Sequence, residues 1–143
     1  MESIQININH VWVMVAACMV FFMQLGFTSY EAGFSQSKNA ISISIRNLVE
    51  FLVSSLAFYV VGFGFMFGAS HMGWIGTNHF FASGVTTHPV NLAYTFFFYQ
   101  LVFAATASTI VSGAIAERSC FIPNVIGPAF MVGVIYPIFG HWA

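Results

Sequence analysis

Four long apolar runs limit what this chain can fold into. They cover residues 11–32, 41–67, 92–116 and 122–143. Each run can cross the ~30 Å hydrocarbon core of a bilayer as a helix, which takes about 20 residues. Inside lipid the backbone must satisfy its own hydrogen bonds, so helix is favoured even where Phe and Val have modest helix propensity. The runs do not alternate in hydrophobicity as barrel strands do. The sequence therefore predicts an all-α integral membrane protein, a polytopic helical bundle.

Charged residues are too few for a soluble domain. Only 5% of the residues are charged and 59% are hydrophobic, whereas an average soluble domain is roughly 25% charged. Three basic residues cannot neutralise a row of phosphates, so nucleic-acid binding is not expected. The sequence has no Asp and its four Glu are scattered, so we expect no enzyme.

The segment 69–91 between the second and third runs contains three of the five histidines. His71, His79 and His88 have spacings that match no zinc pattern, and no Cys lies near them in the sequence. We interpret them as exposed loop histidines, and we expect neither a metal site nor a cofactor.

The basic residues all fall on two connections. Lys38 and Arg46 lie at the first connection and Arg118 at the third, whereas segment 69–91 has no Lys or Arg. Cytoplasmic loops are enriched in Lys and Arg. We therefore expect a multi-pass protein of the inner (plasma) membrane, with the N-terminus and segment 69–91 outside.

Three ionisable residues lie near the expected cytoplasmic edge of the first two runs. They are Glu31, Arg46 and Glu50. Ionisable groups at membrane depth are costly and usually functional, but near a helix end they can pair. Arg46 and Glu50 are four residues apart and can form a structural pair on one helix face, or Arg46 can pair with Glu31. A proton relay is the alternative.

One face of the third run combines an amide, an aromatic ring and small apolar groups. Its members recur at helical spacing: Gln100, Phe103, Ala107, Ile110 and Ala114. Such a face suits a narrow, dry conduit with an aromatic gate, because a ring attracts a small cation by about 1–2 kcal/mol when desolvated. The chain has 18 Phe, so a ring that merely packs or faces lipid is the alternative.

Small residues and a proline add two structural expectations. Ala105, Thr109, Ser112 and Ala116 form a face of the third run that can let another helix approach closely, unless the spacing is due to chance. Pro137 removes a backbone hydrogen bond deep in the fourth run and predicts a kink or an early end.

Several segments resemble ammonium transporters of the Amt family, in the same order and spacing. The family's first helix and first cytoplasmic turn have counterparts in residues 22–27, 31–34 and 37–39. The end of its third helix is similar to residues 113–118 with Phe121. Its fourth helix is similar to Tyr136-Pro137 with Gly140-His141-Trp142. The matches extend over nearly the whole chain. The resemblance implies transport of ammonium or ammonia through a hydrophobic pore with an aromatic gate.

The resemblance also implies roles for residues of the third and fourth runs. Phe103 would be the outer phenylalanine of the gate, beneath the ammonium recruitment site. Tyr99 and Gln100 would lie one turn above it, and Tyr136 would line the pore from the fourth helix.

Two residues of the first run would lie toward the cytoplasmic exit. They are Phe27 and Tyr30. The implied mechanism is capture of ammonium at an aromatic cage, followed by loss or relay of its proton, because carrying a bare charge through an apolar pore is costly.

The family has eleven helices built from two inverted five-helix repeats, with the pore between the repeats. The chain carries about four of them, and the recruitment-site tryptophan is expected directly after Ala143. The paired pore histidines, the second gate phenylalanine and the aspartate of the fifth helix are also outside it. We therefore expect an N-terminal fragment of a parent protein. The resemblance implies a homotrimer regulated by a PII-type protein at its cytoplasmic face.

Two other functions stay open at this point. Some members of the family are fused to kinase or cyclase modules, so the chain could belong to an ammonium sensor. It could also be a small membrane subunit that packs in a larger assembly without transport. The sequence that follows Ala143 in the gene would separate these alternatives.

Overall fold

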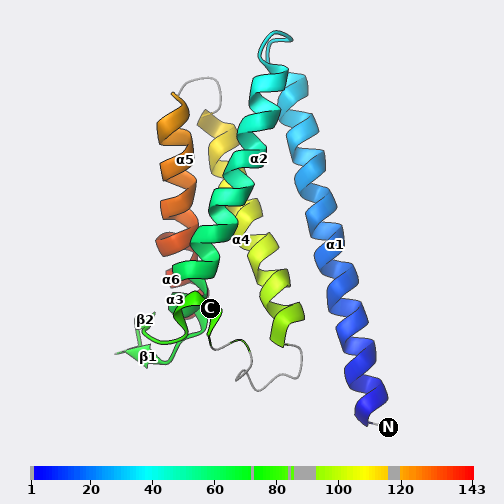
Figure 1. Cartoon of the computed structure of the whole chain (residues 1–143), viewed down its shortest axis with the longest axis vertical. Coiled ribbons are helices and arrows are strands. Elements are labelled where there is room, and N and C mark those ends of the chain that lie inside the picture. Colours follow the sequence, from blue (N-terminus) through cyan, green and yellow to red (C-terminus); the bar gives the residue numbers. More distant parts are fainter. Residues whose placement is uncertain (1, 72, 84, 86–92, 116–119) are drawn as a thin grey trace.

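The computed structural model describes residues 2–71, 73–83, 85, 93–115 and 120–143. Four long helical segments dominate it (Figure 1), and all four are long and apolar enough to cross a membrane. In chain order they are α1 (Glu2–Phe34); α2 (Ala40–Ala57), the π-helical η1 (Phe58–Gly62) and α3 (Phe63–Phe67); α4 (Ala93–Ile115); and α5 (Phe121–Phe130), the π-helical η4 (Met131–Ile135) and α6 (Tyr136–Trp142). The predicted all-α membrane bundle is therefore confirmed.

Helix α1 begins earlier than the apolar run indicates. It starts at Glu2 and includes the polar residues before Val11, so that it is 33 residues long. At 1.5 Å per residue such a helix measures about 50 Å, which exceeds the ~30 Å hydrocarbon core. Adding residues to an existing helix costs little, so polar residues can prolong it outside lipid. The first turns of α1 therefore project beyond the hydrocarbon, or the helix tilts.

Spans that are consecutive in the chain run antiparallel (Figure 1). Helix α1 packs against α2 and α4, and α2 packs against α4 and α5. On α4, Ala105, Thr109 and Ser112 are buried, as expected for a face that permits close approach, while Ala116 lies outside the described residues. Thr109 accepts a hydrogen bond from Gln24 Nε2 of α1 at 2.5 Å. The face of α4 with small residues therefore packs against α1 and accepts a hydrogen bond from a polar side chain of that helix.

Two π-helical segments pack against each other where the second and fourth spans meet. A Cβ added to Gly62 of η1 would lie 3.0 Å from the carbonyl oxygen of Val132 in η4. Pro137 is the second residue after η4, and it cannot donate a hydrogen bond to the carbonyl of Gly133. The sequence predicted a kink or an early end of the helix at Pro137, and the early end is wrong. The span passes through the π-helical η4 before Pro137 and continues to Trp142.

A small hairpin follows the second span. Strand β1 (Ser70–His71) pairs antiparallel with β2 (Ile75–Gly76), and the short 3-10 helix η2 (Phe80–Ala82) comes next. The sequence had indicated only a loop here. Proline suits the first turn of a helix, so the sequence predicts a helix start at His88-Pro89, and these two residues lie outside the described ones.

The end of the fourth span makes hydrogen bonds and a ring contact with the hairpin and the end of the second span. Trp142 Nε1 donates a hydrogen bond to the carbonyl oxygen of Trp74 at 2.9 Å, and the two indole rings meet edge to face at 5.6 Å. His141 Nδ1 lies 2.9 Å from the carbonyl oxygen of Met66. These contacts fix the segment after the second span to the end of the fourth.

We expect Gly76→Ala to lower the thermal unfolding midpoint of the parent protein. A Cβ at Gly76 would lie 2.5 Å from the carbonyl oxygen of Gly64 and 2.8 Å from Cα of Gly68, both of which are backbone atoms that cannot move aside. Such overpacking costs about 1–3 kcal/mol. Gly26→Ala is the matched control, because nothing lies within 4 Å of its added Cβ. An equal midpoint for both variants in detergent would contradict this close packing.

Candidate functional site

Helix α4 brings two of the predicted site residues into ring contact. Tyr99 and Phe103 are four residues apart, so their side chains lie on the same face. Their ring centroids are 4.8 Å apart with the planes inclined by 58°. Gln100 is half-buried beside them. The arrangement offers aromatic faces and one amide, which are groups that can attract a small cation.

Tyr136 joins this group from the fourth span. Its ring is partly buried against the aromatic core that includes Phe58 and Val132. Its phenol group is close enough to Tyr99 for an electrostatic interaction. Tyr136 therefore lies near Tyr99, which itself contacts Phe103.

Phe27 and Tyr30 lie at a different depth. The Phe27 ring packs against Gly113 of α4, where an added Cβ would lie 3.0 Å from Phe27 Cζ. Tyr30 is 63% exposed and its ring contacts Phe34 at 4.5 Å. Phe103 and Gly113 are ten residues apart on one helix, which corresponds to about 15 Å. The six predicted residues therefore form two groups at different depths of the bundle.

The expected conduit face of α4 is not enclosed by the described helices. Ala107 is half-buried, Ile110 is 58% exposed and Ala114 is exposed. The exposed part of this face extends along α4 between the two aromatic groups. The described part of the chain therefore supplies one wall of any pathway and does not surround it.

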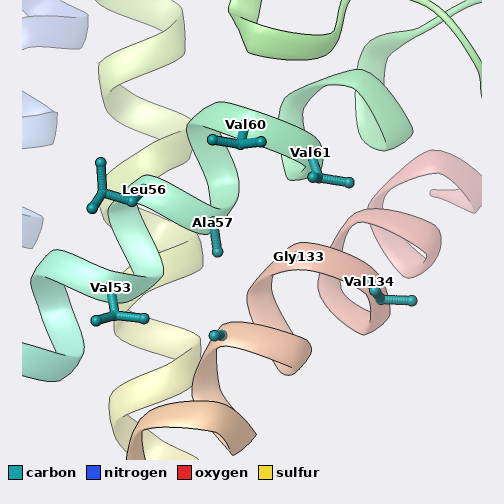
Figure 2. Close-up of a pocket in the computed structure, with 8 residues that line it drawn as sticks. Val53, Leu56, Ala57, Val60, Val61, Gly133 and Val134 are labelled. Atoms are coloured by element: carbon teal, nitrogen blue, oxygen red, sulfur yellow. The ribbon is translucent and has the colours of Figure 1, made fainter.

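An apolar groove lies elsewhere, between the second and fourth spans. Figure 2 shows its lining residues on the two neighbouring helices, and its volume is about 460 Å³. They are Val53, Leu56, Ala57, Val60, Val61, Ala129, Gly133 and Val134. These side chains offer no charge, hydroxyl, amide or aromatic ring. The groove therefore does not qualify as an ammonium site.

The sequence reasoning missed an aromatic cluster centred on Phe97. Its ring lies 6.1 Å from Phe58, 6.2 Å from Tyr59 and 5.3 Å from Phe63, measured between centroids. The abundance of Phe hid this signal, because nothing in a run such as residues 94–99 distinguishes a packed ring from one facing lipid. Phe97 and Tyr136 both pack against the buried core that contains Phe58 and Phe63.

Buried polar contacts between α1, α2 and α4 were predicted only in part. Glu50 Oε1 accepts a hydrogen bond from the Ser108 hydroxyl at 3.1 Å, and Ser108 is 2.8 Å from the hydroxyl of Ser54. Glu31 Oε2 accepts a hydrogen bond from Asn47 Nδ2 at 2.7 Å. Both carboxylates had been singled out with Arg46 as the expected partner, and Arg46 is close enough to Glu50 to attract it electrostatically. The hydrogen bonds from Asn47 and Ser108 were not predicted.

Among the residues that the structure describes, no three His, Cys, Asp or Glu side chains come together as a metal site.

Apolar spans, a buried polar interface and aromatic groups at two depths define the chain as part of a polytopic helical membrane protein. Residues 11–143 match the family model described as Ammonium Transporter Family. The chain belongs to this family.

Similar proteins agree with this assignment. The chain is 45% identical to ammonium transporter Amt2 of Archaeoglobus fulgidus over 99% of its own length and 30% of the relative's. It is 42% identical to a putative ammonium transporter of Synechocystis over 96% of its length and 25% of that protein's. A solved structure titled Sensor Amt Protein matches with a TM-score of 0.96 and 71% identity, over 100% of this chain and 35% of that one. The chain therefore spans about a third or less of the proteins that it matches.

Proposed function

We propose that this chain forms four helices of a membrane protein that binds ammonium and conducts ammonium or ammonia through an apolar pore. The observation that carries the proposal is the family match over residues 11–143. The names of the relatives support it, because the Archaeoglobus and Synechocystis proteins are both called ammonium transporters.

In this proposal the group of Tyr99, Gln100 and Phe103 forms part of the outer mouth. The contacting rings of Tyr99 and Phe103 present a π surface to ammonium, while Gln100 can accept a hydrogen bond from it. Tyr136 lines the next part of the path from the fourth span. Apolar groups beyond the gate oppose a hydrated ion, so ammonium gives up or relays its proton.

Phe27 and Tyr30 lie toward the inner exit. The exposed face of α4 with Ile110 and Ala114 is then covered by later helices of the parent protein, which complete the pore.

The topology and assembly are also part of the proposal. The connection with Lys38 faces the cytoplasm, because basic residues are retained inside, and the N-terminus lies outside the plasma membrane. The parent protein is a homotrimer, and a PII-type protein binds its cytoplasmic face. Labelling of single cysteines introduced at Lys38 and Trp74 tests this topology, and equal reactivity from one side of the membrane would contradict it.

Phe103→Ala in the full parent protein tests the pore. We expect uptake of methylammonium into proteoliposomes to fall about tenfold, because a desolvated cation-π contact contributes about 1–2 kcal/mol. The Tyr99 ring also loses its neighbour at 4.8 Å.

Phe98→Ala is the matched control for this experiment. Phe98 lies on the same helix but is exposed, and its position five residues away puts it on another face. We expect near-normal uptake in this variant. Unaltered uptake in Phe103→Ala would remove Phe103 from the path, whereas an equal loss in both variants would indicate a general effect on α4.

Ammonium sensing is the second candidate function. The 71% identity to a structure titled Sensor Amt Protein favours it, since the named transporters cited above are less than 50% identical. The two functions predict different results for the parent protein. A transporter accumulates methylammonium in proteoliposomes, whereas a sensor binds ammonium and changes the activity of an attached signalling module without comparable flux.

A further inference from the structure

A buried acidic layer lies between α1, α2 and α4. We define this layer by five residues: Glu31, Asn47, Glu50, Ser108 and Ser112. All five side chains are more than nine-tenths buried, and Glu31, at 9% exposed, is the least buried of them. Ionised carboxylates away from water need hydrogen bonds and compensating positive charge. The hydrogen bonds and charges already present in the layer therefore decide which ligand it can bind.

The hydrogen bonds leave several oxygen atoms of the layer unsatisfied. Asn47 Nδ2 donates to Glu31 Oε2, and Ser108 donates to Glu50 Oε1. Among the described residues, no hydrogen bond of good geometry reaches Glu31 Oε1, Glu50 Oε2 or the Asn47 amide oxygen. The Ser112 hydroxyl is close enough to Glu50 to interact with its carboxylate. An unsatisfied buried polar group costs about 1–3 kcal/mol, more when charged. Three oxygen atoms therefore need a species that offers positive charge or donors.

The partner has to be small. These oxygen atoms are already enclosed by helices of this chain, with almost no surface left. A side chain on a later helix of the parent protein would have to pass between α1, α2 and α4 to reach them. Ions and water are small enough to enter such a space, whereas a further helix is not.

The charges of the layer favour a monovalent cation. Glu31 and Glu50 interact electrostatically with each other, and Arg46 is the cation that interacts with Glu50. Helix α4 has no charged residue, and it contributes Ser108 and Ser112. Among the described residues, two ionised carboxylates and one guanidinium leave one net negative charge. A single monovalent cation neutralises this charge, whereas a divalent one would leave an excess.

We propose that the buried acidic layer is a binding site for one small monovalent cation, held by oxygen atoms of Glu31, Glu50, Asn47 and Ser112. Carboxylate, amide and hydroxyl oxygens are the ligands that hard cations prefer. A shared proton would satisfy only one of the free oxygen atoms by donating a hydrogen bond, while a coordinated ion contacts several. The bound ion links α1, α2 and α4. It is separate from the group of Tyr99, Phe103 and Tyr136, whereas Glu31 and the Phe27 ring both lie against Gly113.

Thermal unfolding of the full-length parent protein in detergent tests this site. Sodium, potassium or ammonium chloride would be compared with choline chloride at equal ionic strength, because choline is too large to enter. We expect at least one small cation to raise the unfolding midpoint by about 3–5 °C at saturating concentration. The cation that gives the shift at the lowest concentration identifies the preferred ligand.

Variants connect the shift to the layer. Glu31→Gln and Glu50→Gln should lose it, whereas Glu2→Gln, at the distant start of α1, should keep it. Ser112→Ala is a milder change that should still fold, and it should raise the cation concentration needed for half of the shift at least threefold. A midpoint that is the same in all four salts would overturn the proposal. A midpoint that depends on pH but not on the cation would also overturn it, in favour of a shared proton.

Discussion

Phe58→Ala is expected to lower the free energy of unfolding of the parent protein by about 3–5 kcal/mol, the range for removal of a buried aromatic side chain. Phe58 is fully buried, and its ring lies 6.4 Å from Phe63 and 6.1 Å from Phe97. In lipid the loss comes mainly from packing, because the apolar surroundings reduce the hydrophobic contribution. Thermal or denaturant unfolding of the purified protein in detergent measures it.

Phe22→Ala is the control for this experiment. Phe22 lies on α1 with 69% of its side chain exposed, so its removal leaves no cavity among the described helices. We expect a change below about 0.5 kcal/mol, as for most surface substitutions. If both variants unfolded at the same midpoint, the aromatic cluster would not stabilise the bundle as we infer.

Ser108→Leu should have a comparable or larger effect and prevent accumulation of folded protein. Ser108 is fully buried, and its hydroxyl contacts both Glu50 and Ser54. The larger side chain would push α2 away from α4, which costs about 1–3 kcal/mol. It would also leave Glu50 without its hydrogen-bond donor, at about 1–3 kcal/mol or more for a charged group. Size-exclusion chromatography in detergent would measure the loss of monodisperse protein.

Two variants separate packing from hydrogen bonding at this position. Ser108→Ala removes the hydroxyl without adding volume, so we expect a folded but less stable protein. Ser29→Leu makes the same change at an exposed position of α1, and we expect normal yield. A Ser108→Leu protein that matched Ser29→Leu in yield and midpoint would refute the close packing of α2 and α4.

Local sequence patterns predicted much of the fold. The lengths of the apolar runs are sufficient to place four helices, because a bilayer imposes both helix and minimum length. The start of α1 at Glu2 was not predicted, since polar residues carry no hydropathy signal for a helix that extends outside lipid. The hairpin at Ser70 and Gly76 depends on contacts with Gly64 and Gly68, which no local pattern reveals.

The candidate site was predictable where its residues share one helix. The contact of Tyr99 with Phe103 follows from their spacing of four residues. The approach of Tyr136 and the packing of Phe27 on Gly113 depend on how separate helices are aligned. Hydropathy places a helix in the membrane but does not fix its rotation, so these contacts needed the structure.

The paired π-helical segments affect how side-chain directions are counted along their spans. An α-helix turns by about 100° per residue, and a π-helical turn holds an additional residue. Positions before η1, such as Ser54, and after it, such as Phe63, therefore do not follow one uninterrupted 3.6-residue repeat. The same applies across η4 to Pro137. A helical wheel drawn through either span would therefore place the residues after the π-helical segment on the wrong face relative to those before it. In the second span, the polar half and the aromatic half each need a helical wheel of their own.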